Sequence, residues 1–368
     1  MKLLTREGHT VGCKLNYIPF NRHCHLRYDF GKEGVSTAIF PHIYWQYWGG
    51  VVMPNTINPY PITTTKRALD YQRVITQAIP PGVSFQPCMV CYLNEETDLE
   101  NLESGFLQGV WVAAKTYMAH GKSGTTGSDW GVGDIKGIYP HLTVLQELGM
   151  PWLIHGEIHN HKTDIFDREA LFIKNVLRQV LRDFPRLNVV LEHITTKEAV
   201  NLVFEMNGGV RATITPHHLR FNRNALFDGG RSPFKIGVRP DFFCLPILKE
   251  EHHRQELLRA IASGSEWFGA GDDTAAHPEE AKYCRCGCAG CFNSVTSVEW
   301  YWEAFLEAGA TQYFENFMCL NFLDTYGLEP KSGVFVIEEE RWTVPKKCGP
   351  VVPIFAGEEM VWKARIAS

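Results

Sequence analysis

The residues best suited to chemistry are four histidines that stand where short apolar runs of the sequence end. His23 and His25 are separated by one residue, so in a β-strand both imidazoles point to the same side and can reach one ion. His155 and His193 each close a further apolar run. A single histidine at a strand end is commonly structural, but four of them at strand ends favour a metal centre, because neutral imidazole binds zinc well.

Acids and one lysine accompany these histidines. Glu157 follows His155 and Glu192 precedes His193, and carboxylates often orient metal-binding imidazoles. Lys115 ends the apolar run 110–115, where burial would lower its pKa and favour a neutral amine. Such an amine can add carbon dioxide to give a carbamate able to bridge two metals. The alternative is a lysine paired with a buried aspartate.

These side chains need a scaffold that brings strand ends together. Strand-like runs, the first placed near residues 15–25, alternate about eight times with helical patterns over some 300 residues, which predicts a parallel sheet. We therefore expect an α/β fold, a (β/α)8 TIM barrel, whose functional residues lie at the carboxyl ends of its strands. The rhythm is lost after Leu328. Residues 1–368 are expected to form one domain, with about 329–368 as a short C-terminal appendage packed on the barrel.

Composition excludes several classes of partner. The chain of 368 residues has a net charge of −5, which argues against nucleic acid and anionic membranes. No apolar run reaches the roughly 20 residues that span a bilayer, and the first ten residues do not resemble a signal peptide. The 11 cysteines are odd in number, which favours reduced thiols and a cytoplasmic location. Cysteines 284, 286, 288 and 291 resemble a metal site by spacing, but a third metal there is not favoured.

Several strings together resemble one family. The chain is similar to the dihydroorotases of the stand-alone bacterial and fungal type, within the amidohydrolase superfamily. The matching strings cover roughly residues 20–310 in the family's order, and they are His23-Cys24-His25-Leu26-Arg27, Val52-Met53-Pro54-Asn55, Ala113-Ala114-Lys115-Thr116-Tyr117, Leu153-Ile154-His155-Gly156-Glu157, His193-Ile194-Thr195-Thr196-Lys197, Cys244-Leu245-Pro246-Ile247-Leu248-Lys249 and Cys286-Gly287-Cys288-Ala289-Gly290-Cys291-Phe292-Asn293.

The resemblance implies a centre with two Zn²⁺ per subunit. His23, His25 and Asp273 would hold one ion, His155 and His193 the other, and carboxylated Lys115 would bridge them. The implied reaction is the reversible cyclisation of N-carbamoyl-L-aspartate to L-dihydroorotate in de novo pyrimidine biosynthesis. In hydrolysis, a bridging hydroxide would attack the ring amide carbonyl, with Asp273 as general acid and base.

The same resemblance implies how the small-molecule substrate is bound. Its carboxylate would be held by Arg27, Asn55 and His277, and the backbones of Leu245 and Ala289 would contact its ring. Thr125 and Thr126 would close over it on a glycine-rich lid. The family also suggests a homodimer.

Some positions depart from the family's pattern. Asn21 replaces an aspartate two residues before the first histidine, and His217 replaces a glutamine in the string that ends His218-Leu219. Asp272 stands beside Asp273, which leaves two candidates for the catalytic acid, although the register favours Asp273. Two alternatives remain: another cyclic-amide hydrolase of the superfamily, which Arg27 and Asn55 disfavour, and an inactive dihydroorotase-like scaffold.

Overall fold

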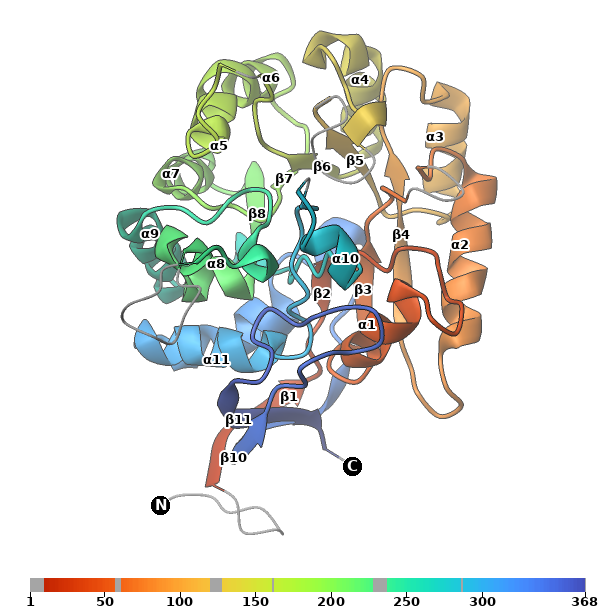
Figure 1. Ribbon diagram of the computed structural model, residues 1–368. Helices are drawn as coiled ribbons and strands as arrows, with labels where there is room; N and C mark the ends of the chain where they lie inside the picture. The colour runs from red at the N-terminus through yellow and green to blue at the C-terminus, as the bar shows by residue number, and fades with distance from the viewer. Residues whose placement is uncertain are drawn as a thin grey trace.

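A parallel barrel forms the body of the molecule (Figure 1). The computed structural model describes residues 10–56, 61–119, 128–160, 162–227, 237–285 and 287–367. Eight strands pair in chain order, each parallel to the next: β2 (Asn21–Cys24), β3 (Gly49–Val52), β4 (Gln86–Tyr92), β5 (Ala113–Tyr117), β6 (Trp152–His155), β7 (Val189–Leu191), β8 (Val210–Ile214) and β9 (Phe268–Ala270). The predicted (β/α)8 fold is confirmed.

The first and last strands meet just beyond their carboxyl ends. There the backbone N–H of Asp273 donates to the carbonyl of His23 over 2.9 Å, and His25 donates to the carbonyl of Thr274 over 3.1 Å. The barrel thus closes through residues that the sequence assigns to the metal centre.

Helices surround the barrel (Figure 1). Side-chain caps start several of them, because Thr64, Asp98 and Thr196 each accept a hydrogen bond from a first-turn N–H. The α-helices are α1 (Val35–Tyr44), α2 (Thr65–Ala78), α3 (Leu99–Leu107), α4 (Tyr139–Leu148), α5 (Arg168–Phe172), α6 (Arg178–Asp183), α7 (Lys197–Met206), α8 (Pro216–Arg220), α9 (Glu251–Ala262), α10 (Glu279–Lys282) and α11 (Ser297–Glu307).

Shorter helical turns connect these elements. A π-helical segment, η4 (Ile173–Leu177), joins α5 to α6, so the helix from Arg168 to Asp183 is continuous but not uniform. The others are η2 (Ser128–Trp130), η3 (Ile135–Ile138), η5 (Arg223–Leu226), η6 (Pro240–Phe242), η7 (Thr311–Tyr313), the π-helical η8 (Asn316–Leu320) and η9 (Asp324–Tyr326).

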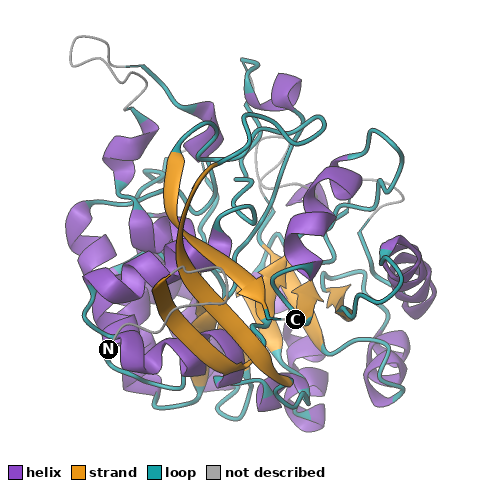
Figure 2. Cartoon of the chain, turned by 90° about the horizontal axis from the view of Figure 1, so that it is seen from below, coloured by secondary structure: helices purple, strands orange, loops and turns teal. Residues whose placement is uncertain are grey.

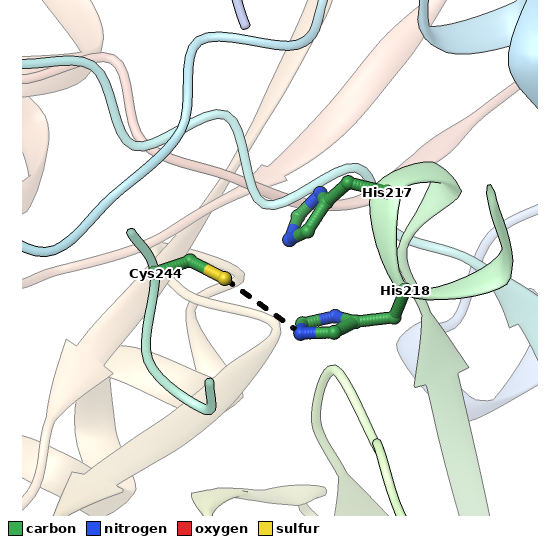
Figure 3. Close-up of side chains that lie close together, drawn as sticks. All are labelled: His217, His218 and Cys244. Carbon is green, nitrogen blue, oxygen red and sulfur yellow. Dashed lines mark hydrogen bonds between the residues drawn. The ribbon is translucent and has the colours of Figure 1, made fainter. Parts of the chain in front are cut away.

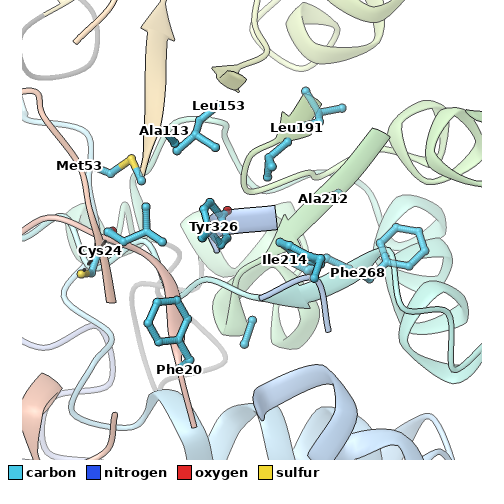
Figure 4. Close-up of a cluster of buried hydrophobic side chains, with 14 of the residues drawn as sticks. Phe20, Cys24, Met53, Ala113, Leu153, Leu191, Ala212, Ile214, Phe268 and Tyr326 are labelled. Atoms are coloured by element: carbon cyan, nitrogen blue, oxygen red, sulfur yellow. Dashed lines mark hydrogen bonds between the residues drawn. The ribbon is translucent and has the colours of Figure 1, made fainter. Parts of the chain in front are cut away.

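Buried apolar side chains fill the barrel (Figure 4). Phe20, Leu153, Ile214 and Phe268 come from four different strands or their approaches and lie in one cluster with Tyr326 of η9. This packing fixes the strands, so that polar residues at their carboxyl ends are held in place.

An antiparallel sheet forms the appendage (Figure 2). It contains β10 (Ser332–Thr343) and β11 (Glu359–Ile366), as expected of a tail outside the βα rhythm. Its third strand, β1 (Thr10–Tyr17), comes from the N-terminus and pairs with β10. The expected first barrel strand near residues 15–25 was therefore wrong in its bounds, because that stretch contains the end of β1, a break at Pro19 and then β2.

Candidate active site

The first group of candidate ligands gathers where β2 and the segment after β9 meet. Asp273 Oδ1 lies 3.2 Å from His23 Nε2 and 3.0 Å from His25 Nε2. The two Nε2 atoms are 3.3 Å apart. The three side chains are buried, so three ligand atoms converge in a space from which water is largely excluded.

The second group lies at the ends of β6 and β7. His155 Nδ1 is 3.2 Å from His193 Nε2, and both side chains are buried. The rings of His23 and His193 have their centroids 5.0 Å apart, so the two groups adjoin. The four histidines predicted from separate strand ends therefore occupy one site.

Two buried carboxylates orient these imidazoles. Glu157 Oε2 lies 2.9 Å from His155 Nε2, so the Nδ1 atom of His155 is the one that faces His193. Glu192 Oε2 lies 2.7 Å from His23 Nδ1, which leaves Nε2 directed at the first group. Glu192 was expected to orient its neighbour His193, but it bonds to a histidine 169 positions away. Glu192 and His193 lie in the turn after β7, where His193 has a φ of 41°.

Lys115 projects from β5 into the same region. Its side chain is fully buried, and Nζ has no hydrogen-bond partner among the described residues. Burial lowers the pKa of Lys115 to about 8, against the opposing pull of Glu192 and Asp273. Its Nζ lies 5.2 Å from the centre of the Tyr117 ring, and no described carboxylate pairs with it. A buried amine with a lowered pKa and no hydrogen-bond partner in the described structure fits the carbamate hypothesis better than the alternative of a lysine in a salt bridge.

The charges of the first group depend on their mutual contacts. Burial alone would raise the pKa of Asp273, but contacts with His23 and His25 hold it well below its ordinary value. Burial lowers the pKa of His25 to about 4. The aspartate is therefore ionised and His25 neutral, the forms in which both bind metals.

The neighbouring Asp272 is placed differently. Its Oδ1 accepts a hydrogen bond from the N–H of Thr274 over 3.0 Å, and burial raises the pKa of Asp272 to about 6. Of the two candidates, Asp273 is the one whose carboxylate the structure brings among the imidazoles.

The expected substrate-binding residues surround a small cavity at the same barrel end. Arg27, Asn55, Leu245 and Ala289 line it together with Asp273 and three of the four histidines, His25, His155 and His193. His277 stands at its edge, with Nε2 3.2 Å from Arg27 Nη2 and 3.0 Å from the carbonyl of Ala289. Thr125 and Thr126 lie outside the described residues.

Tyr117 also lines this cavity, and sequence reasoning missed it. Its signal was available, because Tyr117 stands two positions after Lys115 in β5 and so shares its face of the strand.

Other clusters of possible ligands are few. In the described part of the chain, three groups of metal-ligating side chains have ligand atoms within 4.8 Å of one another, and none includes Cys284 or Cys288. Two of the groups contain histidines of the site above. The third is His217, His218 and Cys244 (Figure 3).

Comparisons with known proteins agree with this geometry. No family model matches the chain. A dihydroorotase of Cupriavidus taiwanensis is 42% identical over 356 residues, which cover 94% of this chain and 97% of that protein. A dihydroorotase of Leptothrix cholodnii is 41% identical over 350 residues, 94% of this chain and 96% of that protein.

The chain belongs to the dihydroorotase family.

Solved structures of a dihydroorotase and of a hydantoinase superpose on this chain. The dihydroorotase of Campylobacter jejuni superposes with a TM-score of 0.82 at 29% identity, covering 95% of this chain and 96% of its own. An L-hydantoinase of Arthrobacter aurescens superposes with a TM-score of 0.76 at 14% identity, covering 94% of this chain and 82% of its own, and so shares the fold.

Dihydroorotases are metal-dependent enzymes that hydrolyse cyclic amides, and this chain has the buried histidine and aspartate groups that such a centre needs. Among the described residues, no helix has the length and apolar character required to cross a membrane.

Proposed function

We propose that this protein is an active dihydroorotase, which interconverts N-carbamoyl-L-aspartate and L-dihydroorotate in de novo pyrimidine biosynthesis. The observation that carries the proposal is the convergence of two ligand groups beside a buried lysine that makes no hydrogen bond with the described residues. Three ligand atoms lie within 3.3 Å of one another in the first group, and two lie 3.2 Å apart in the second. An inactive scaffold would have no need to keep these groups buried and ordered.

The ligand set fits two Zn²⁺ ions. His23, His25 and Asp273 would hold one, and His155 and His193 the other. The neutral Nζ of Lys115 would form an N–C bond with carbon dioxide and lose a proton, and the resulting carbamate would offer one oxygen to each ion. Bound zinc would supply Lewis acidity, which lowers the pKa of water and polarises an amide carbonyl.

Asp273 would move the proton in this reaction. It is a carboxylate at neutral pH, because its pKa lies well below the ordinary value. In hydrolysis it accepts the proton of the attacking water and delivers it to the ring nitrogen as the amide bond breaks, so that the proton count balances. In cyclisation the same steps run in reverse.

The polar residues of the cavity would orient the substrate. The Arg27 guanidinium can hold the substrate carboxylate, assisted by Asn55 and His277. Leu245 and Ala289 would contact the ring through their backbones, and Thr125 and Thr126 would close over it. Hydantoin-like rings lack this carboxylate, so Arg27 favours a dihydroorotate-type substrate over the alternative of another cyclic amide.

The test is an assay of dihydroorotate hydrolysis, run beside hydantoin and dihydrouracil as carboxylate-free rings. We expect dihydroorotate to be the preferred substrate and Asp273→Asn to lose nearly all activity. Asp70→Asn is the matched control, because Asp70 is an exposed carboxylate that pairs only with Arg73 in a surface salt bridge. Equal activity of Asp273→Asn and wild type would refute the mechanism. Preference for hydantoin would favour the alternative hydrolase, and absence of both activity and bound metal would favour the scaffold.

Three broader expectations belong to the same proposal. The protein would act in the cytoplasm, as a single domain of barrel and appendage, and as a homodimer. Light scattering at micromolar concentration tests the last of these, and a monomer mass would contradict it.

A further inference from the structure

Asp273 adopts an unusual backbone conformation. Its φ is 48°, in the left-handed region, although it is not a glycine. Residues other than glycine rarely adopt this conformation, although aspartate tolerates it better than most, and it persists where the surroundings enforce it. The segment around Asp273 must therefore be held by specific contacts.

Asn293 holds both neighbours of Asp273. Its Nδ2 donates to the carbonyl of Asp272 over 2.6 Å, and its Oδ1 accepts from the hydroxyl of Thr274 over 2.5 Å. Asn293 is fully buried and follows the loop that carries Ala289. One side chain thus fixes the peptide before Asp273 and the side chain after it.

His217 holds Asn293 in turn. Because a carbonyl oxygen can only accept, the Asn293 atom facing Asp272 must be the amide nitrogen, and its second hydrogen then points to His217 Nδ1, 2.8 Å away. Burial lowers the pKa of His217 to about 4, so the ring is neutral and its proton resides on Nε2.

The position of this proton also bears on whether His217, His218 and Cys244 form a metal site (Figure 3). The Nε2 atom of His217 carries a proton and has no partner among the described residues, so it is not available to a metal. Both nitrogens of His218 are engaged, by Thr215 Oγ1 at 2.6 Å and by the carbonyl of Pro246 at 2.9 Å. His217 therefore supports Asn293, while His218 Nε2 lies 3.8 Å from Cys244 Sγ (Figure 3), and the hydrogen bonds of the two histidines argue against a third metal site.

We propose that Asn293 is a positioning residue that holds Asp273 in its strained conformation among the imidazoles, and that His217 orients Asn293. The proposal rests on the proposed function for the role of Asp273 as proton carrier. It adds two residues that act on the reaction without touching the reacting atoms.

The test compares four variants with wild type. Asn293→Ala removes the contacts with Asp272 and Thr274, His217→Leu removes the acceptor for Asn293, and His217→Gln restores an acceptor as an amide oxygen. Ser294→Ala is the matched control, since Ser294 is equally buried and its hydroxyl makes no hydrogen bond within the described structure. The measurements are kcat and KM at saturating zinc, zinc affinity by chelator competition, and the melting temperature.

We expect Asn293→Ala to lower kcat by about 10- to 100-fold with KM changed by less than about 3-fold, and to weaken zinc binding at one site by about 10-fold. His217→Leu should give a smaller loss of kcat, which His217→Gln largely recovers. Ser294→Ala should match wild type.

An unchanged kcat and zinc affinity in Asn293→Ala would overturn the proposal. The proposal would also be overturned if activity fell only in proportion to the melting temperature and fell equally in Ser294→Ala. If Asn293→Ala does not fold, His217→Leu decides: a lowered kcat recovered by His217→Gln supports the proposal, and an unchanged kcat overturns it. If wild type itself does not act on dihydroorotate, the proposed function fails, and the zinc affinities alone decide the positioning role.

Discussion

Two fully buried cations stand at opposite ends of the barrel, in very different surroundings. Arg22, at the start of β2, donates through Nε to the carbonyl of Asn321 over 2.9 Å, and through Nη1 to three further carbonyls, those of Phe20, Phe317 and Met318, over 3.3 Å each. Lys115, the middle residue of β5, makes no hydrogen bond with the described residues.

This difference in hydrogen bonding distinguishes a buried cation that stabilises the fold from one that can react. Burial lowers the pKa of Arg22 to about 10, so it stays charged. Backbone carbonyls accept hydrogen bonds from its Nε and Nη1, whereas Nη2 has no hydrogen-bond partner among the described residues. Burial lowers the pKa of Lys115 to about 8, and no carbonyl compensates. A cation with most of its donors on backbone carbonyls serves stability, whereas an amine that makes no hydrogen bond with the described residues is available for reaction.

Replacing Lys115 should give the largest effect on activity. Lys115→Met keeps the length of the side chain and removes the amine, so no carbamate can form. We expect kcat/KM to fall by more than about 100-fold, because loss of a residue that only supports a metal ligand costs up to about 100-fold. The melting temperature should stay equal or rise. Retention of a tenth or more of the wild-type activity would contradict the role of the lysine.

Replacing Arg22 should give the opposite pattern. Arg22→Met leaves buried carbonyls without donors, and we expect a loss of about 4 kcal/mol in the free energy of unfolding. The activity of each folded molecule should stay within about 2-fold of wild type. Urea denaturation and active-site titration together measure both quantities, and an unchanged urea midpoint would remove the contrast between the two cations.

The free energy of unfolding of the metal-free protein should depend on pH, because burial disfavours the charged form of Lys115. The folded-state pKa is about 8 and the ordinary value is 10.5, so between these values the unfolded chain binds the proton and the folded chain does not. Stability due to this group therefore rises with pH through that window, by up to about 3 kcal/mol. Denaturation of metal-free wild type and Lys115→Met over this range checks the sign. A rise of equal size in both proteins would assign it to other groups.

A smaller effect should follow from weakening the contact with Glu157 that orients the His155 imidazole. Glu157→Gln keeps the shape of the side chain that orients His155 but removes its charge, so we expect about a 10-fold loss in zinc affinity or kcat. Chelator competition and kinetics measure the two. Gln179→Glu, on the exposed face of α6, serves as a control for a swap between amide and carboxylate outside the site.

The sequence predicted the elements that local patterns encode. The apolar run that His155 closes forms β6, and the alternation of strand-like runs with helical patterns gives the eight parallel strands, because apolar runs, caps and prolines act locally. The start of the barrel was misplaced, because β1 and β2 are both extended segments separated only by a short break at Pro19, and nothing local shows which of them joins the barrel.

The candidate site shows the same division. The histidines, Lys115 and Asp273 could be named from strand ends and from the family resemblance. The partnership of Glu192 with His23, and the bonds of Asn293 with Asp272 and His217, could not, because each joins residues far apart in sequence. Such contacts depend on how the barrel closes, which no local pattern encodes.

The most direct test of the central claim is carbon-13 NMR of the zinc-loaded protein in labelled bicarbonate, combined with metal analysis of the same sample. We predict one carbamate resonance and two zinc ions per chain in wild type and in Arg22→Met, and no carbamate in Lys115→Met. An active wild-type protein with no carbamate resonance, or a resonance that persists in Lys115→Met, would contradict the account of Lys115 as the reactive buried cation.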